Sequence, residues 1–284
     1  MMQTHLVGRR LALIFILRAT CSAVSQQQVH LQITTTDNVH FLLTDPEGRT
    51  CGRDPRGASD PSEGTEIDGI PGANYSFETV GAIPDSGESS FAVYYHVLAC
   101  TYDSPQCDGT YRIQVIGIEL GRFDLYASID PAKGSNCQRA RFKVKGGMID
   151  KDSTITYEMY YSCSPATQSS FEKVVTVQGI RQDLSASSKL DLLGDAKWLD
   201  ELFKDLSKIE KEISRHNELK ACLVLKKFQD KIEEARKKTV KNEEKKKKHE
   251  KVFIAEDAYK TVQEDIATLL RRLSTTKKEG KGNR

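Results

Sequence analysis

The sequence has no apolar run long enough to cross a membrane, and this absence argues against a protein with membrane-spanning helices. The longest apolar stretch covers residues 11–17 and has seven residues, whereas a membrane-spanning helix needs about 20. We therefore expect no transmembrane segment, and a mature chain that is soluble.

The short motifs that mark common enzymes and metal centres are also missing. There is no G-x-S-x-G nucleophile elbow, no phosphate-binding loop and no G-x-G-x-x-G turn. No two cysteines have the C-x2–4-C spacing of a zinc site, and the six histidines are scattered. We therefore expect no enzyme, no cofactor and no zinc. An enzyme with an unrecognised site is kept as the third hypothesis.

The chain does begin with the pattern of an export signal. Arg9 and Arg10 precede the apolar run, and Ala23 and Ser25 supply the small residues of a cleavage site. Residues 1–25 are therefore predicted to be a signal peptide. The mature protein is expected to be secreted, periplasmic or held at the cell surface.

Six cysteines remain after the predicted signal, and an even number suggests disulfides in an exported protein. They are Cys51, Cys100, Cys107, Cys137, Cys163 and Cys222. Cys100 and Cys107 flank a short turn-rich loop between two strand-like runs, so we predict that they pair. Cys137 with Cys163 is the second candidate pair. The pairing of the other two cysteines is left open.

Two turns of the form D-P-x-G, at residues 45–48 and 54–57, punctuate the first part of the chain. In such a turn Pro fixes the backbone, Asp accepts hydrogen bonds from nearby backbone groups, and Gly closes the reversal. Around these turns, alternating β-prone runs recur, as in residues 110–118 and 123–129. The pattern predicts an antiparallel β-sandwich of the immunoglobulin or jelly-roll type over residues 26–180.

Near residue 180 the alternation is replaced by apolar residues spaced three and four apart. Residues 181–189 are rich in small polar side chains and are predicted to be a linker. Residues 190–274 contain three amphipathic segments, which predicts a three-helix domain. Residues 275–284 are predicted to be a disordered basic tail. The expected fold class is multidomain, all-β followed by all-α.

Both parts resemble modules of bacterial extracellular proteins. The runs D-P-E-G-R, G-R-D-P, I-P-G-A-N-Y and G-T-Y-R-I-Q-V-I-G resemble, in that order, a small β-sandwich module of secreted and surface proteins. The second part is similar to the FIMAH domain, a short three-helix module at the C-terminal end of secreted enzymes and repeat proteins. The matching positions are Ala221, Phe228, Ile232, Ala258, Ile266 and Leu269. All are apolar helix positions, so this resemblance describes packing and not a site.

Two sets of side chains are candidates for ligand contacts in the β part. Loop carboxylates can bind calcium, although Asp is also an ordinary turn residue; they are Asp45, Asp54, Asp60, Asp68, Asp103 and Asp108. Aromatic rings can stack on sugars or pack in a core; they are Tyr94, Tyr95, Tyr157, Tyr160, Tyr161 and Trp198. Turn formation and core packing are the preferred interpretations, and calcium is kept open.

Charge is divided unevenly along the chain. Residues 189–284 hold 26 basic and 19 acidic side chains, and the remainder holds 16 and 21. The densest basic cluster is a candidate anion patch, although neighbouring glutamates dilute it and such segments also serve as solvated spacers. Its members are Lys245, Lys246, Lys247, Lys248 and Lys251.

The preferred hypothesis is a secreted, non-catalytic binding, adhesion or accessory protein whose partner is an extracellular protein or a glycan. The alternative is a polyanion-binding or cell-surface-binding protein that acts through the Lys-rich helical domain. Nucleic acid is not expected as a partner.

Overall fold

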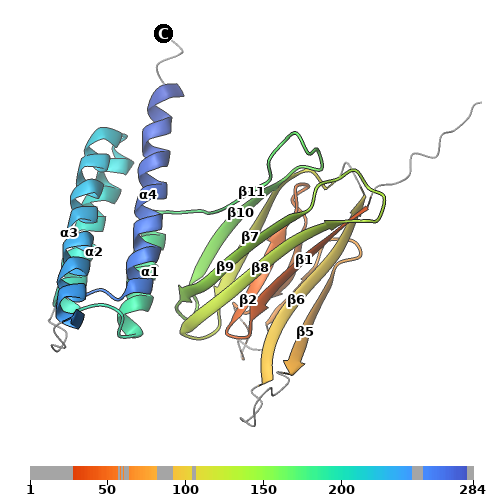
Figure 1. Ribbon diagram of the computed structural model, residues 1–284, viewed down its shortest axis with the longest axis horizontal. Coiled ribbons are helices and arrows are strands. Elements are labelled where there is room, and N and C mark those ends of the chain that lie inside the picture. Colours follow the sequence, from red (N-terminus) through yellow and green to blue (C-terminus); the bar gives the residue numbers. More distant parts are fainter. Residues whose placement is uncertain are drawn as a thin grey trace, which may run out of the picture.

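A computed structural model describes residues 28–56, 58, 60, 64–81, 92–103, 107–244 and 252–279 (Figure 1). Within them, eleven strands precede four helices along the chain. The strands are β1 (Gln28–Thr36), β2 (Val39–Thr44), β3 (Thr50–Asp54), β4 (Thr65–Asp68), β5 (Asn74–Gly81), β6 (Ala92–Asp103), β7 (Gly109–Gly117), β8 (Gly121–Pro131), β9 (Ala140–Ile149), β10 (Thr154–Tyr161) and β11 (Ser170–Lys173). The helices are α1 (Val177–Lys189), α2 (Ala196–Ser214), α3 (Glu218–Glu244) and α4 (Glu256–Glu279). The predicted signal peptide lies outside the described residues.

The strands form two antiparallel sheets, which we call the two-sheet body. One sheet has the order β5-β6-β1-β8-β9, and the other has the order β11-β10-β7-β2-β3-β4. Both sheets contribute side chains to one hydrophobic core, because alternate side chains of a strand point to opposite faces. In β1, for example, Val29, Leu31 and Ile33 are at most 1% exposed, whereas the residues between them face solvent. The prediction of β structure before helices is confirmed.

The first D-P-x-G turn joins β2 to β3 in the geometry that its sequence predicts. The carboxylate of Asp45 accepts hydrogen bonds from the backbone N–H groups of Glu47 and Arg49, at 3.0 and 2.9 Å, and from Arg49 Nε at 2.7 Å. Gly48 has a φ of 81°, where a side chain would be strained. Asp45 is only 3% exposed, whereas Glu47 and Gly48 are exposed, so a buried carboxylate holds a turn whose tip faces solvent.

Helical structure begins earlier than the sequence predicts. α1 starts after Thr176, whose hydroxyl caps the helix by accepting a backbone hydrogen bond at 2.9 Å. The helix includes residues 181–189, so the prediction of a linker there was wrong. Of the polar residues that suggested a linker, Asp183 and Ser187 are buried, and Ser185 and Ser188 are half-buried. Ser187 is fully buried and donates to the carbonyl of Asp183 at 2.7 Å.

The four helices, which we call the helical part, enclose a second hydrophobic core. α2, α3 and α4 correspond to the three predicted amphipathic segments, and α1 is an additional helix that packs on α2 and α4. The only tryptophan, Trp198, is 4% exposed in this core. α4 continues to Glu279, into the segment predicted to be a disordered tail, and residues 280–284 lie outside the described residues.

The helical part lies beside one edge of the two-sheet body (Figure 1). α1 contacts β9, the edge strand of the five-stranded sheet. Met148, from β9, belongs to the hydrophobic core of the helical part. The two parts therefore share buried side chains. The predicted domain boundaries themselves stay a prediction.

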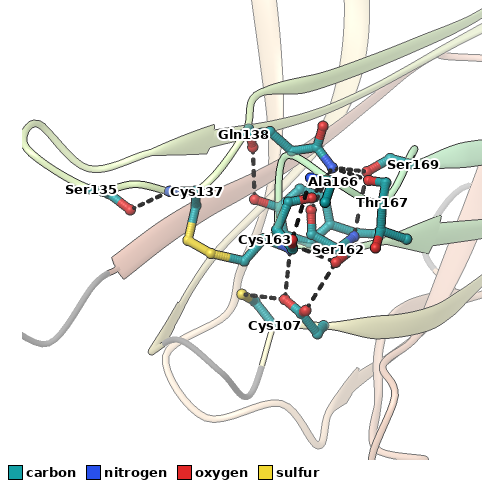
Figure 2. Close-up of a disulfide and its surroundings, with 12 residues drawn as sticks. Cys107, Ser135, Cys137, Gln138, Ser162, Cys163, Ala166, Thr167 and Ser169 are labelled. Carbon is teal, nitrogen blue, oxygen red and sulfur yellow. Dashed lines mark hydrogen bonds between the residues drawn. A yellow bond between two sulfur atoms is a disulfide. The ribbon is translucent and has the colours of Figure 1, made fainter.

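The Cys137–Cys163 disulfide is present, as predicted. It ties the segment that precedes β9 to the turn that follows β10 (Figure 2). Beside it, the side-chain amide of Gln138 lies 2.7 Å from the carbonyl oxygen of Ser162 and 2.6 Å from that of Thr167. The two segments are thus joined by a covalent bond and by hydrogen bonds.

The disulfide predicted between Cys100 and Cys107 is not formed, because both residues are thiols. The chain passes from one sheet to the other between them: β6 is in the five-stranded sheet and β7 is in the six-stranded sheet. Cys100 belongs to β6, and Cys107 lies in the turn before β7; both side chains are buried. Burial raises the pKa of the Cys100 thiol to about 12 and that of the Cys51 thiol to about 11. Cys222 is a partly exposed thiol in α3.

Replacing Cys137 and Cys163 together by serine should lower the free energy of unfolding by about 3–4 kcal/mol, because the bond closes a loop of 26 residues. Urea unfolding of both proteins without reductant measures this difference. In a companion experiment, the denatured wild-type protein is alkylated before and after reduction. Reduction should add two alkylated cysteines to the intact mass, and an unchanged mass would contradict the pairing.

Replacing Asp45 by alanine should lower the free energy of unfolding by about 2–3 kcal/mol, because the backbone N–H groups of Glu47 and Arg49 and the Arg49 side chain lose a charged acceptor that is buried. The matched control is Asp54→Ala in the second D-P-x-G turn, where the carboxylate bonds to Arg56 nearer to solvent. That variant should lose less than about 1 kcal/mol. Equal losses in the two variants, measured by urea unfolding, would refute the assignment of the Asp45 carboxylate as the buried acceptor that holds the first turn.

Candidate binding site

A cleft lies where the helical part meets the edge of the two-sheet body. Its walls come from β9, β10 and β11 on one side and from α1 and α4 on the other. Its volume is about 580 Å³, which is within the usual range of small-ligand pockets, roughly 300–1,000 Å³. We call it the junction cleft.

A buried lysine between two aspartates lines the inner part of the junction cleft. Lys173, at the end of β11, lies with Nζ 2.5 Å from Asp183 Oδ2 of α1 and 2.8 Å from Asp265 Oδ2 of α4. The side chains of the two aspartates are 2% and 4% exposed, and that of Lys173 is 17% exposed. One ammonium group therefore connects a strand to two helices. We call these three residues the lysine cluster.

The surroundings of the lysine cluster determine which of its groups are charged. Burial by itself would lower the pKa of Lys173, but the nearby carboxylates, Asp183 foremost, raise it above its ordinary value. Burial raises the pKa of Asp265 to about 8; Lys173 opposes this shift and Asp183 adds to it. With Asp265 protonated, the ammonium of Lys173 and the carboxylate of Asp183 form a neutral pair. This state avoids the large free-energy cost of an unpaired buried charge.

Two aromatic rings of the sheet-side wall, Tyr157 and Phe171, belong to a stack of three. The ring centroids of Phe142 and Phe171 are 5.3 Å apart with planes at 16°, and those of Phe171 and Tyr157 are 5.2 Å apart at 7°. Phe171 is thus stacked between a ring from β9 and a ring from β10. This stack gives the wall a fixed shape, since each ring is held by its neighbour.

The exposed rim of the junction cleft is mainly cationic. Lys143, Lys145 and Arg271 line the cleft with exposed side chains, and among the described residues none of the three forms an ion pair with a carboxylate. Four acidic residues also line it: Asp183 and Asp265 are buried against Lys173, and Glu172 and Glu264 are exposed. Glu172 lies 3.6 Å from Arg272, which leaves Glu264 to oppose the three cations. A cleft whose exposed charges are mostly positive favours a ligand with an anionic group.

The structure places the predicted aromatic candidates mostly in hydrophobic cores. Tyr157, Tyr161 and Trp198 are at most 5% exposed, which confirms packing as their role. Tyr160 is 38% exposed. The side chains of the other two tyrosines lie outside the described residues.

The aspartates considered for calcium occupy separate local structures. Asp45 and Asp54 bond to the turns that contain them. Asp108 accepts hydrogen bonds from the Cys163 N–H at 2.8 Å and from the Ser162 hydroxyl at 3.2 Å. In the part of the chain that the structure describes, no three His, Cys, Asp or Glu residues are grouped as metal ligands.

The candidate anion patch, Lys245 to Lys248 with Lys251, lies outside the described residues. The lysine cluster and the cationic rim were not singled out by sequence reasoning, because their members are far apart in the chain. A signal for the cluster did exist. Asp265 falls in the apolar helical stripe of Val262, Ile266 and Leu269, where a charged residue needs a buried partner.

Comparison of the chain with protein-family models, with curated proteins and with solved structures found no match. Among the described helices, none combines the length and the apolar character needed to span a bilayer. The function must therefore be argued from the junction cleft itself.

Replacing Lys173 by methionine should destabilise the protein by about 3–5 kcal/mol at pH 8, because two buried carboxyl groups lose their counter-charge. The loss should be smaller at pH 5. The pKa of Asp265 is raised in the fold, so its protonated form contributes stability that is full below the ordinary carboxyl pKa of about 4 and declines as pH rises toward about 8. Lys173 opposes this shift. Its removal raises the pKa further, so between pH 5 and pH 8 the variant loses more stability than the wild type. Urea unfolding at the two pH values measures the difference.

Lys189→Met is the matched control, since Lys189 of α1 also pairs with an aspartate, Asp150, but is largely exposed. It should lose less than about 1 kcal/mol at either pH. The triple variant Lys173→Met/Asp183→Asn/Asp265→Asn should recover much of the lost stability. An equal loss at pH 5 and pH 8 in Lys173→Met would contradict the charge assignment.

Proposed function

We propose that this protein is an exported, non-catalytic binding protein that holds an acidic glycan in the junction cleft. The observation that carries the proposal is the set of three exposed cations, Lys143, Lys145 and Arg271, around a cleft of ligand size. The export pattern at the start of the chain supports an extracellular ligand.

The size and lining of the cleft support a sugar chain as the ligand. A volume of about 580 Å³ accommodates a small molecule or a short part of a polymer. The rim residues are exposed, so the rest of a longer chain would lie in solvent outside the cleft. Carboxylate or sulfate groups on the sugars would pair with the lysines and with the guanidinium group of Arg271.

Binding is favoured over catalysis by the state of the buried carboxyl groups. General acid–base chemistry requires a carboxyl group that can reach the substrate and exchange a proton with it. Here both carboxyl groups contact the same ammonium of Lys173, and both are almost fully buried. Their arrangement suits a structural tie between β11, α1 and α4, which keeps the walls of the cleft in place.

The wider organisation that we propose is a β-sandwich followed by a FIMAH-like helical domain. The six positions that carry the FIMAH resemblance are all at most 7% exposed within α3 and α4. This burial supports their role in packing. Under this proposal α1 is an addition that links the helical domain to the sandwich edge.

The triple variant Lys143→Glu/Lys145→Glu/Arg271→Glu should bind acidic oligosaccharides at least about tenfold more weakly than the wild-type chain, because it reverses the charges at the rim. Calorimetry with heparin fragments and oligogalacturonates, and with neutral dextran fragments as a negative reference, measures this. Wild-type affinity should also fall as salt is added.

A charge-matched control tests whether position matters. Lys197→Glu/Lys211→Glu/Lys227→Glu changes net charge by the same amount at exposed positions on α2 and α3, and it should retain most of the affinity. A second variant replaces the five lysines of the candidate anion patch by glutamine. If that variant loses binding while the rim variant keeps it, the site is the Lys-rich segment and the proposal is wrong. Turnover of the oligosaccharides by the wild-type chain would reject a non-catalytic role.

A further inference from the structure

A second hollow, formed mainly by apolar side chains, lies between the start of α3 and the end of α4. Its volume is about 600 Å³. Leu219 and Leu223 of α3 are 63% and 62% exposed, and Leu270 and Leu273 of α4 complete the apolar lining. We call it the α3–α4 groove.

The exposed leucines do not belong to the core-facing side of α3. That side is formed by Ala221, Leu225 and Phe228, which are at most 1% exposed. Leu219 and Leu223 are four residues apart, so they are neighbours on a different face of the helix, and the partly exposed Cys222 lies beside them. Leucines are rarely left so exposed in pairs unless another surface covers them.

The longer segments of the mature chain outside the described residues do not suit the groove. Residues 1–25, which contain the apolar run 11–17, are predicted to be removed as a signal peptide. Residues 245–251 and 280–284 contain charged, polar and glycine residues and lack large apolar side chains. Residues 82–91 join β5 to β6, at the opposite edge of the five-stranded sheet from β9. The occupant is therefore expected to be another molecule.

Two of the three charged residues that line the groove complement those of a second copy related by a two-fold axis. The third is Arg271, which also lines the junction cleft. The two are Glu218 and Lys226, which lie four residues before and four residues after Cys222. Neither has an ion-pair partner among the described residues. If two α3 helices cross antiparallel at Cys222, Glu218 of each faces Lys226 of the other. This self-complementarity is what a two-fold interface requires.

The geometry points to a homodimer in which the α3–α4 grooves of two copies pack against each other through Leu219 and Leu223. The antiparallel α3 helices form two equivalent Glu218–Lys226 ion pairs. A dimer would carry two junction clefts on one particle, so a repetitive glycan could bind with higher avidity.

Sedimentation velocity over a concentration series tests the dimer directly. The wild-type chain should shift from monomer to dimer by about 100 µM, a concentration at which micromolar complexes form. Leu219→Glu/Leu223→Glu should remain monomeric at that concentration with an unchanged unfolding midpoint, since both side chains are exposed. Tyr160→Glu, which alters an exposed aromatic residue of β10, is the control and should dimerise normally.

Charge exchange then tests the antiparallel arrangement. Glu218→Lys and Lys226→Glu should each weaken dimerisation by at least about tenfold, and the double exchange Glu218→Lys/Lys226→Glu should restore it. A short bismaleimide reagent should cross-link wild-type copies through Cys222, and should not cross-link the double leucine variant. A wild-type chain that stays monomeric at about 100 µM, or a dimer that survives the leucine substitutions, would overturn the inference.

Discussion

Lys173 lies between two buried carboxyl groups that belong to different helices, and this contact positions the rest of the molecule. Asp183 is ten residues away in the sequence and Asp265 is 92 residues away. A charge in such a place is tolerated only with its partner. The end of β11, the middle of α1 and the middle of α4 must therefore come together whenever the chain folds. The buried Met148 of β9, which packs among the helices, adds an apolar contact to the same junction.

The junction cleft follows from this constraint. One wall is the edge of the two sheets, where Phe171 is stacked between Phe142 and Tyr157, and the other wall is α4. Because the lysine cluster holds the walls together, the exposed cations of β9 and Arg271 of α4 face the same space. The binding function that we propose thus depends on a charged contact that takes no direct part in binding.

Sequence reasoning predicted the elements well where one local rule dominates. Alternation predicted residues 110–118 and 123–129 as strands, and β7 and β8 lie there. The spacing of apolar residues predicted three helices, and α2, α3 and α4 lie there. Local reasoning failed for residues 181–189, where tertiary contacts determine the secondary structure. This segment is helical, and Asp183 and Ser187 are buried in the fold.

Local sequence patterns were also insufficient to predict the site and one of the two proposed disulfides, because both depend on tertiary contacts. Cys137 and Cys163 do pair, but short sequence spacing was a poor guide for Cys100 and Cys107, which are buried thiols on either side of the passage from one sheet to the other. The lysine cluster joins residues from three elements, so no local pattern could place them together. Only the presence of Asp265 within an apolar stripe indicated that a buried partner must exist.

The central claim is that the two-sheet body and the helical part are held as one unit by the lysine cluster. The most direct measurement is urea unfolding followed by two probes on the same sample. Trp198 fluorescence reports on the helical core that contains this residue, and hydrogen exchange of β7 and β10 amides reports on the sheets. A single unit predicts that both probes change at the same urea concentration. Two separate transitions, with the helical part lost while the strands remain protected, would contradict the claim.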